Sequence, residues 1–138
     1  MIGNDARSLL AGRDGTTAVE FALASMALVL FVFGAVEMGR MLWTQQVLQS
    51  VATDTARCLA IGSGNCPDGG SYAVSAAVKR GLNDVQSAEV AVSLNDSCGS
   101  AVGLFTKVTI TYPFAPVLPA YIPSPAGGLT ASACFPHD

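Results

Sequence analysis

The feature that most constrains this chain is an uncharged apolar run near its N-terminus, Phe21 to Val36. Its 16 residues would form about 24 Å of α-helix. With its apolar flanks, the stretch is long enough for the ~30 Å hydrocarbon core of a bilayer. We therefore predict a membrane-spanning helix over residues 16–42. A short polar segment, residues 1–15, precedes it, and a domain of residues 43–138 follows.

Composition agrees with a membrane-anchored chain. Of the 138 residues, 51% are hydrophobic and only 12% are charged, about half the charged fraction of ordinary soluble domains. The net charge is −3, and the sequence contains no cluster of lysine and arginine. Nucleic-acid binding needs a basic face, so we expect no nucleic-acid partner.

The basic residues around the apolar run predict its orientation. Arg7 and Arg13 precede it, and Arg40 follows, so the positive-inside rule places the N-terminus in the cytoplasm. The domain of residues 43–138 would then lie outside the cytoplasm, with Trp43 as an interfacial aromatic anchor. A cleaved secretory signal fits less well, because its apolar core is shorter and ends at small residues.

An acidic residue, Glu20, lies just inside the apolar stretch. An ionised carboxylate at the bilayer centre costs roughly 2.5–3.5 kcal/mol. The segment from Gly15 to Phe21, GTTAVEF, resembles the prepilin processing site of the type IV pilin superfamily. That resemblance implies a cut after Gly15 that makes Thr16 the new N-terminus. The new α-amino group would lie one helical turn from Glu20 and could neutralise it, or the Glu20 of a neighbouring subunit. Without processing, Glu20 would instead reach up to the lipid headgroups.

A second acidic residue, Glu37, lies near the other end of the span. It precedes Arg40 by three residues, so both side chains share one helix face. We predict an interfacial ion pair that sets the depth of the helix in the membrane. Contact of these residues with a partner subunit is the alternative.

The remaining chain predicts an α+β fold. Apolar residues at helical spacing continue the long helix from about Thr16 to about Ala60, and Gly62 to Ser71 reads as a loop. A short helix is expected at Tyr72–Leu82. The predicted strands are Glu89–Leu94, Leu104–Tyr112 and Gly128–Cys134, with a proline-rich loop before the last. We expect the long helix to pack on a small domain made of the short helix and about three antiparallel strands.

Four cysteines, Cys58, Cys66, Cys98 and Cys134, all follow the apolar run. In an oxidising compartment their even number predicts two disulfides. Their spacing favours Cys58 with Cys66 and Cys98 with Cys134, and the other two connectivities remain open. A zinc site is the competing interpretation. It is disfavoured because no C-x-x-C occurs and His137 is the one histidine of the chain.

The sequence offers no sign of catalysis. It lacks a G-x-S-x-G motif, and no pair of carboxylates has an evident cleft. We expect a protein that is not an enzyme and that uses no cofactor.

Several segments, taken in order, resemble the TadE-like family. They are Ala18 to Leu23 (AVEFAL), Glu37 to Arg40 (EMGR) and Ala56-Arg57 near the helix end, with Val108 to Pro119 (VTITYPFAPVLP) as a later similarity. TadE-like proteins are minor pseudopilins of bacterial tight-adherence (Flp) pilus systems. The resemblance implies a cytoplasmic prepilin-type leader, residues 1–15, and processing by a prepilin peptidase between Gly15 and Thr16.

The same resemblance implies partners and a location. The partners would be other pilins or pseudopilins and the pilus assembly platform of the bacterial inner membrane, with adhesion and biofilm formation downstream. The anchor would be single-pass, with its C-terminal domain in the periplasm or, after assembly, within a pilus. Major Flp pilins are shorter and have tyrosine where this chain has Phe21, which favours a minor pseudopilin. A signal-anchored envelope protein and a type II secretion pseudopilin are the alternatives.

Overall fold

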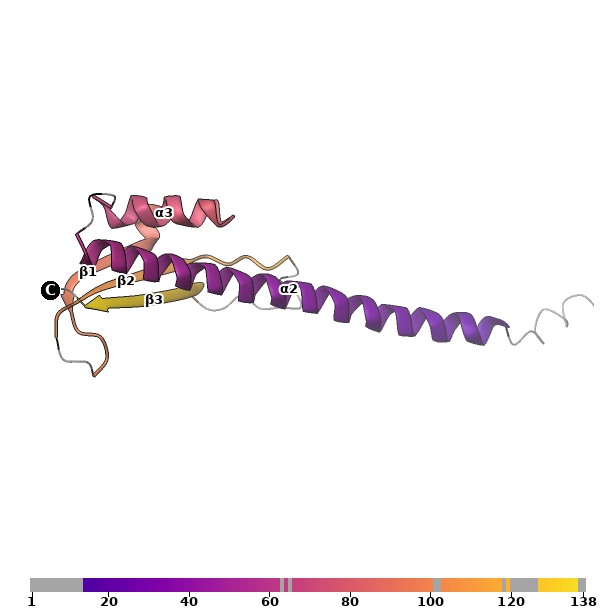
Figure 1. Ribbon diagram of the computed structural model, residues 1–138. Coiled ribbons are helices and arrows are strands. Elements are labelled where there is room, and N and C mark those ends of the chain that lie inside the picture. The colour runs from indigo at the N-terminus through magenta and orange to yellow at the C-terminus, as the bar shows by residue number, and fades with distance from the viewer. Residues whose placement is uncertain are drawn as a thin grey trace, which may run out of the picture. The chain divides into compact units, whose positions relative to one another are not determined.

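The computed structural model describes residues 14–62, 64, 66–100, 103–117, 119 and 127–136. Two helices, a short 3-10 helix and three strands follow one another along these residues (Figure 1). Their bounds are α2 Asp14–Ala60, α3 Gly69–Lys79, η1 Ser87–Glu89, β1 Val90–Asp96, β2 Phe105–Tyr112 and β3 Leu129–Pro136. This confirms the predicted α+β fold.

The chain divides into two compact units. The first runs up to Glu37, and the second comprises Met38 to Asp138. Helix α2 continues through the boundary without a break.

The sheet is antiparallel, in the order β1-β2-β3. Val92 pairs with Val108, and Ile110 pairs with Ala131. Side chains alternate between the two faces of a strand, and the alternate residues Thr106, Val108 and Ile110 are fully buried. The predicted period-2 pattern of β2 is therefore confirmed, and the buried face of this strand packs against the helices.

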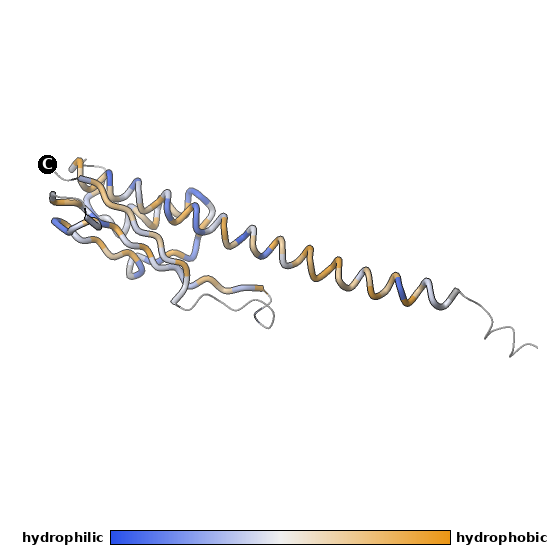
Figure 2. The backbone as a smooth tube through the Cα atoms, turned by 90° about the horizontal axis from the view of Figure 1, so that it is seen from below, coloured by the Kyte–Doolittle hydropathy of each residue, from blue (hydrophilic) through white to orange (hydrophobic). Residues whose placement is uncertain are grey.

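Both helices cover this one face of the sheet. The C-terminal part of α2 contributes its predicted apolar stripe to the core, including Leu48, Val51 and Ala52, none of which is exposed. Helix α3 adds Ala73 and Ala77. Figure 2 shows the alternation of hydrophobic and hydrophilic positions along these elements.

Small residues set the distance between α3 and its neighbours. A Cβ placed on Gly69 would lie 2.8 Å from a methyl group of Leu59 in α2 and 2.9 Å from one of Val92 in β1. The start of α3 therefore fits between the end of α2 and β1 because this position has no side chain. Alanines farther along α3 continue the close contact.

Helix α2 also covers one edge of the sheet. The side-chain amides of Gln45 and Gln49 donate hydrogen bonds to the carbonyl oxygens of Thr130 and Ser132 in β3, at 2.9 and 3.0 Å. Unpaired strand edges promote association with other chains. These two glutamines, one helical turn apart, satisfy carbonyl groups that would otherwise lie open at the β3 edge.

The predicted bounds of α3 were wrong. Tyr72–Leu82 was expected to be helical, but the helix begins at Gly69 and ends at Lys79. Two glycines after Asp68 indicated a loop, yet Asp68 caps the helix and both glycines lie inside it. Gly81, at φ +86°, ends the helix, and its amide bonds the carbonyl of Val78.

The strands differ from the prediction by smaller amounts. Glu89 belongs to η1, which was not predicted, and β1 continues to Asp96 past an irregularity after Ser93. Strand β3 continues to Pro136. Part of the predicted proline-rich loop lies outside the described residues.

Candidate functional site

The first turn of α2 holds the predicted processing site. The helix begins at Asp14, so Gly15 and Thr16 are already helical. No atom of the described residues lies within 4 Å of a Cβ placed on Gly15. Glu20 is exposed and lies one turn after Thr16, on the same helix face. Both the cleavage after Gly15 and the pairing of Glu20 with the Thr16 amine stay predictions.

The next part of α2 exposes an unusually apolar surface. Its large hydrophobic side chains are half to three-quarters exposed: Val19, Phe21, Leu23, Met26, Leu28, Val29, Leu30, Phe31, Val32, Phe33 and Val36. They occur on all sides of the helix, and Figure 2 shows this stretch of the tube as mostly hydrophobic. Such a helix belongs in lipid or among other apolar helices. By length and composition α2 can cross a membrane, which fits a single-pass anchor.

Glu37 and Arg40 lie where the apolar surface ends. Glu37 is only 5% exposed. The guanidinium carbon of Arg40 lies 5.7 Å from the centroid of the Phe114 ring, within the range of a cation–π interaction. The ion pair between Glu37 and Arg40 stays a prediction from their spacing. The contact of Arg40 with Phe114 could not be predicted, because the two residues are far apart in the sequence.

A groove opens beside Arg40 on the second unit. Its volume is about 580 Å³, and its lining includes Trp43, Asp84, Tyr112 and Phe114. Gly81 and Trp43 both line the groove and lie close together, since a Cβ on Gly81 would lie 3.3 Å from the indole ring. The sequence predicted Trp43 as an interfacial residue but gave no sign of the groove, which forms from segments distant in the chain.

Charges of both signs act on the groove. Burial raises the pKa of Tyr112, and the carboxylates of Asp84 and Glu89 raise that pKa further, while Arg40 lowers it. The Tyr112 hydroxyl therefore lies within electrostatic range of a cation and of two anions. This arrangement suits a ligand that carries both charges more than a ligand of one sign.

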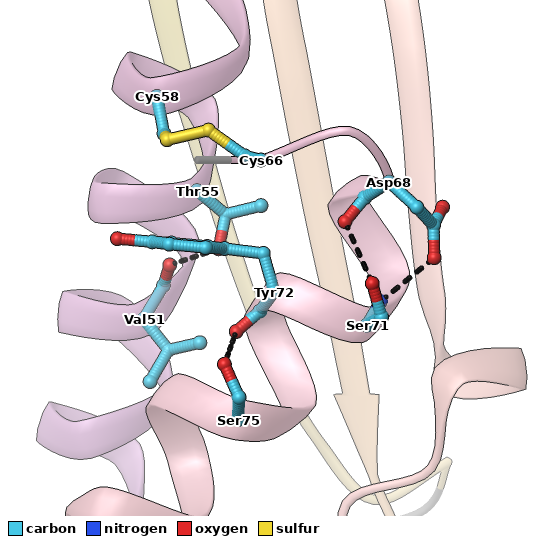
Figure 3. The surroundings of a disulfide bond; sticks show 8 residues. All are labelled: Val51, Thr55, Cys58, Cys66, Asp68, Ser71, Tyr72 and Ser75. Atoms are coloured by element: carbon cyan, nitrogen blue, oxygen red, sulfur yellow. Dashed lines mark hydrogen bonds between the residues drawn. A yellow bond between two sulfur atoms is a disulfide. The ribbon is translucent and has the colours of Figure 1, made fainter. Parts of the chain in front are cut away.

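Two disulfides crosslink segments within the second unit. Cys58 at the end of α2 bonds Cys66, with 6.3 Å between their Cα atoms, and Figure 3 shows this bond beside Thr55 and Tyr72. Cys98 after β1 bonds Cys134 in β3, with a Cα–Cα distance of 6.4 Å. These are the two pairs that the spacing favoured. Among the described residues no group of three or more potential metal ligands occurs, and His137 lies outside them.

Asp68, two residues after Cys66, caps α3. Its carboxylate accepts a hydrogen bond from the amide of Ser71 at 2.9 Å (Figure 3). It also accepts one from the amide of Gly70 at 3.4 Å. The backbone bond from Ser71 is the main reason why the pKa of Asp68 lies below its usual value. The sequence signal was available, since an aspartate directly before a helix is a common N-cap, but the two glycines suggested a turn.

The comparison with known proteins concerns the long helix. Residues 15–57 match the family model of TadE-like proteins, a segment that lies within α2. This confirms, for that segment, the resemblance to TadE-like proteins predicted from the sequence. The later similarity at Val108 to Pro119 lies outside the match. No curated protein and no solved structure matches the chain.

Proposed function

We propose that this protein is a minor pseudopilin of a bacterial tight-adherence pilus system. In this role residues 1–15 are a cytoplasmic leader that a prepilin peptidase removes. Residues 16–42 span the inner membrane, and residues 43–138 form the periplasmic domain. The protein then acts with other pilins and with the assembly platform in pilus biogenesis, and so in adhesion and biofilm formation.

The observation that carries this proposal is the position of Glu20 on α2. The carboxylate lies on an exposed helix that is otherwise apolar over the residues that follow, and the TadE-like match begins at Gly15. A plain anchor has no use for this acidic residue, because a charge in lipid is costly. Processing would give the Glu20 carboxylate a partner of opposite charge, since the cut releases an amine at Thr16, one helical turn away.

The pairing also explains how a processed subunit would recognise its neighbours. Two opposite charges attract far more strongly at low dielectric than in water. A subunit whose Glu20 is not fully neutralised by its own Thr16 amine is therefore drawn to the amine of a neighbour. Side-by-side insertion of subunits would follow from that attraction, with the surrounding apolar side chains in contact.

Cleavage is tested by expressing the full chain with the cognate prepilin peptidase and measuring intact mass. We expect loss of residues 1–15 from the parent chain. Gly15→Ala is expected to block the cut, and Gly34→Ala to leave it unchanged. The two variants make a matched pair, because both glycines are helical and neither has an atom within 4 Å of the added Cβ. A mature chain that still begins at Met1, or that begins after Arg40, contradicts the proposal.

The role of Glu20 is tested by its own substitutions in a strain that assembles pili. Glu20→Gln keeps the size of the side chain and removes its charge, and Glu20→Ala removes both. We expect both variants to be cut normally and both to be depleted from sheared pili and from crosslinks with partner pilins. Normal assembly of Glu20→Gln would show that charge pairing is not the mechanism.

A further inference from the structure

We propose that the groove beside Arg40 binds the headgroup of a zwitterionic aminophospholipid such as phosphatidylethanolamine. The phosphate would lie at Arg40 and the ammonium group at Asp84. The inference rests on the membrane insertion in the proposed function and adds a ligand to it. It concerns the second unit, which contains every residue that lines the groove.

Arg40 is suited to the phosphate. Its side chain is exposed, and the Phe114 ring, itself only 7% exposed, holds the guanidinium at 5.7 Å. A ring contact uses the face of a guanidinium, whereas phosphate oxygens bond the N–H groups in its plane, often two at a time. Arginine has five such donors, so a further protein contact leaves donors for a ligand.

The aromatic residues of the groove suit a lipid surface. Trp43 directly follows the predicted span, and its side chain is 52% exposed. Tryptophan and tyrosine are enriched at the level of the headgroups, because each has an apolar body and a polar group. Tyr112 supplies the second such side chain. The ring faces of these residues can also attract a lipid ammonium group.

Asp84 supplies the negative end of the site. It lines the groove together with Arg40, and it acts with Glu89 on the Tyr112 hydroxyl that Arg40 influences in the opposite sense. A phosphate alone would meet attraction at Arg40 and repulsion at the two carboxylates. A headgroup with both a phosphate and an ammonium group meets attraction at both. The charges therefore favour phosphatidylethanolamine over phosphatidylglycerol.

The size and position of the groove agree with a headgroup. Its volume of about 580 Å³ lies within the usual range of small-molecule sites, roughly 300–1,000 Å³. Arg40 and Trp43 come at the end of the predicted span of residues 16–42. A lipid of the outer leaflet could therefore place its headgroup in the groove while its chains stay in the bilayer.

The test is lipid retention by the full chain. The protein is inserted into nanodiscs that contain equal amounts of phosphatidylethanolamine and phosphatidylglycerol, and is released gently into detergent. Native mass spectrometry then counts the retained lipids. The parent chain is expected to retain phosphatidylethanolamine in preference to phosphatidylglycerol. Arg40→Gln is expected to lower that retention about tenfold, as the loss of one charge-assisted hydrogen bond predicts.

Asp84→Asn provides the decisive comparison. It should abolish the preference by raising phosphatidylglycerol retention relative to phosphatidylethanolamine. Lys79→Gln is the matched control, since Lys79 is an exposed basic residue at the end of α3 and does not line the groove. It should behave as the parent chain does. Circular dichroism establishes that each variant is folded, and the Asp84 variant keeps the test valid if Arg40→Gln fails to fold.

Three results would overturn the inference. The first is equal retention of the two lipids by the parent chain, and the second is parent-like retention by a folded Arg40→Gln. The third is an unchanged preference for phosphatidylethanolamine in a folded Asp84→Asn. None of them depends on cleavage after Gly15. A chain that inserts and is cut but shows no lipid preference loses the headgroup site alone, whereas a chain that is not cut loses the proposed function.

Discussion

At the scale of single residues, the turn before β3 shows how two adjacent glycines can have different requirements. Gly127 and Gly128 have φ values of +86° and +79°, a region that disfavours side chains. A Cβ on Gly127 would meet no described atom within 4 Å. A Cβ on Gly128 would lie 2.4 Å from the carbonyl oxygen of Tyr112. That oxygen belongs to a paired strand and cannot move aside easily.

We therefore predict that Gly128→Ala destabilises the protein much more than Gly127→Ala. Gly127→Ala should cost about 1–2 kcal/mol, the strain of a left-handed backbone at alanine. Gly128→Ala has the same backbone strain and adds a clash with the Tyr112 carbonyl. Its loss of unfolding free energy should therefore exceed that of Gly127→Ala by about 1–3 kcal/mol. Urea unfolding of the detergent-solubilised chain, followed by the fluorescence of Trp43, measures both. Equal costs would show that the close approach to Tyr112 is not maintained.

At the scale of elements, the start of α3 depends on one side chain. The cap at Asp68 accepts the amide bonds of Gly70 and Ser71, which otherwise have no partner in the first turn of a helix. Tyr72 and Ser75 follow on α3, and Figure 3 shows Tyr72 extending toward Thr55 of α2. The cap thus positions the part of α3 that contacts α2.

The cap gives a prediction about pH. Hydrogen bonds from Ser71 hold the pKa of Asp68 below its usual 3.8. A group whose pKa is lower in the folded state stabilises the protein above its unfolded pKa, and that stability is lost as pH falls through the folded value. Unfolding free energy should therefore decrease below about pH 4. Asp68→Asn, which can still cap a helix, should remove this part of the pH dependence.

Urea unfolding at a series of pH values is compared for Asp68→Asn and the parent chain. The decrease of the unfolding free energy below about pH 4 should be smaller in Asp68→Asn. If Asp68→Asn keeps the pH dependence of the parent chain, Asp68 does not contribute through its charge.

The elements were predicted to different degrees for identifiable reasons. Helix α2 and strand β2 have long, regular apolar periods, which determine both the type of element and the buried face. The start of α3 was not predicted because two adjacent glycines, Gly69 and Gly70, are typical of a turn. In the structure both lie in the first turn of the helix. The absence of a side chain at Gly69 lets Leu59 and Val92 approach closely, which a local sequence pattern does not reveal.

At the scale of the whole molecule, the second unit combines a small core with two crosslinks. Cys58–Cys66 closes a separation of 8 residues, and Cys98–Cys134 closes one of 36. The second bond connects the end of β1 to β3, the opposite strand of the sheet. It therefore restricts the unfolded chain more than the first bond does.

We predict unequal effects of removing these bonds. In the chain-entropy relation a loop of 8 residues corresponds to about 2.5 kcal/mol and one of 36 to about 4 kcal/mol. The double variant Cys98→Ala/Cys134→Ala should thus lose more stability than Cys58→Ala/Cys66→Ala. Urea unfolding of the two variants and the parent chain measures the difference. A larger loss from the Cys58–Cys66 pair would show that this bond acts mainly on the folded state, at the corner between α2 and α3.

The sequence by itself determined the apolar helix, the position of its acidic residue and the α+β fold, because each depends on residues that are neighbours in the chain. Charge placement and hydropathy act over one or two helical turns, and strand alternation over a few residues. Only the tertiary structure decided that Gln45 and Gln49 cover the β3 edge, that Gly69 lies between Leu59 and Val92, and that Arg40 meets Phe114 beside a groove. Those contacts join segments distant in the sequence, and their positions depend on how the core packs.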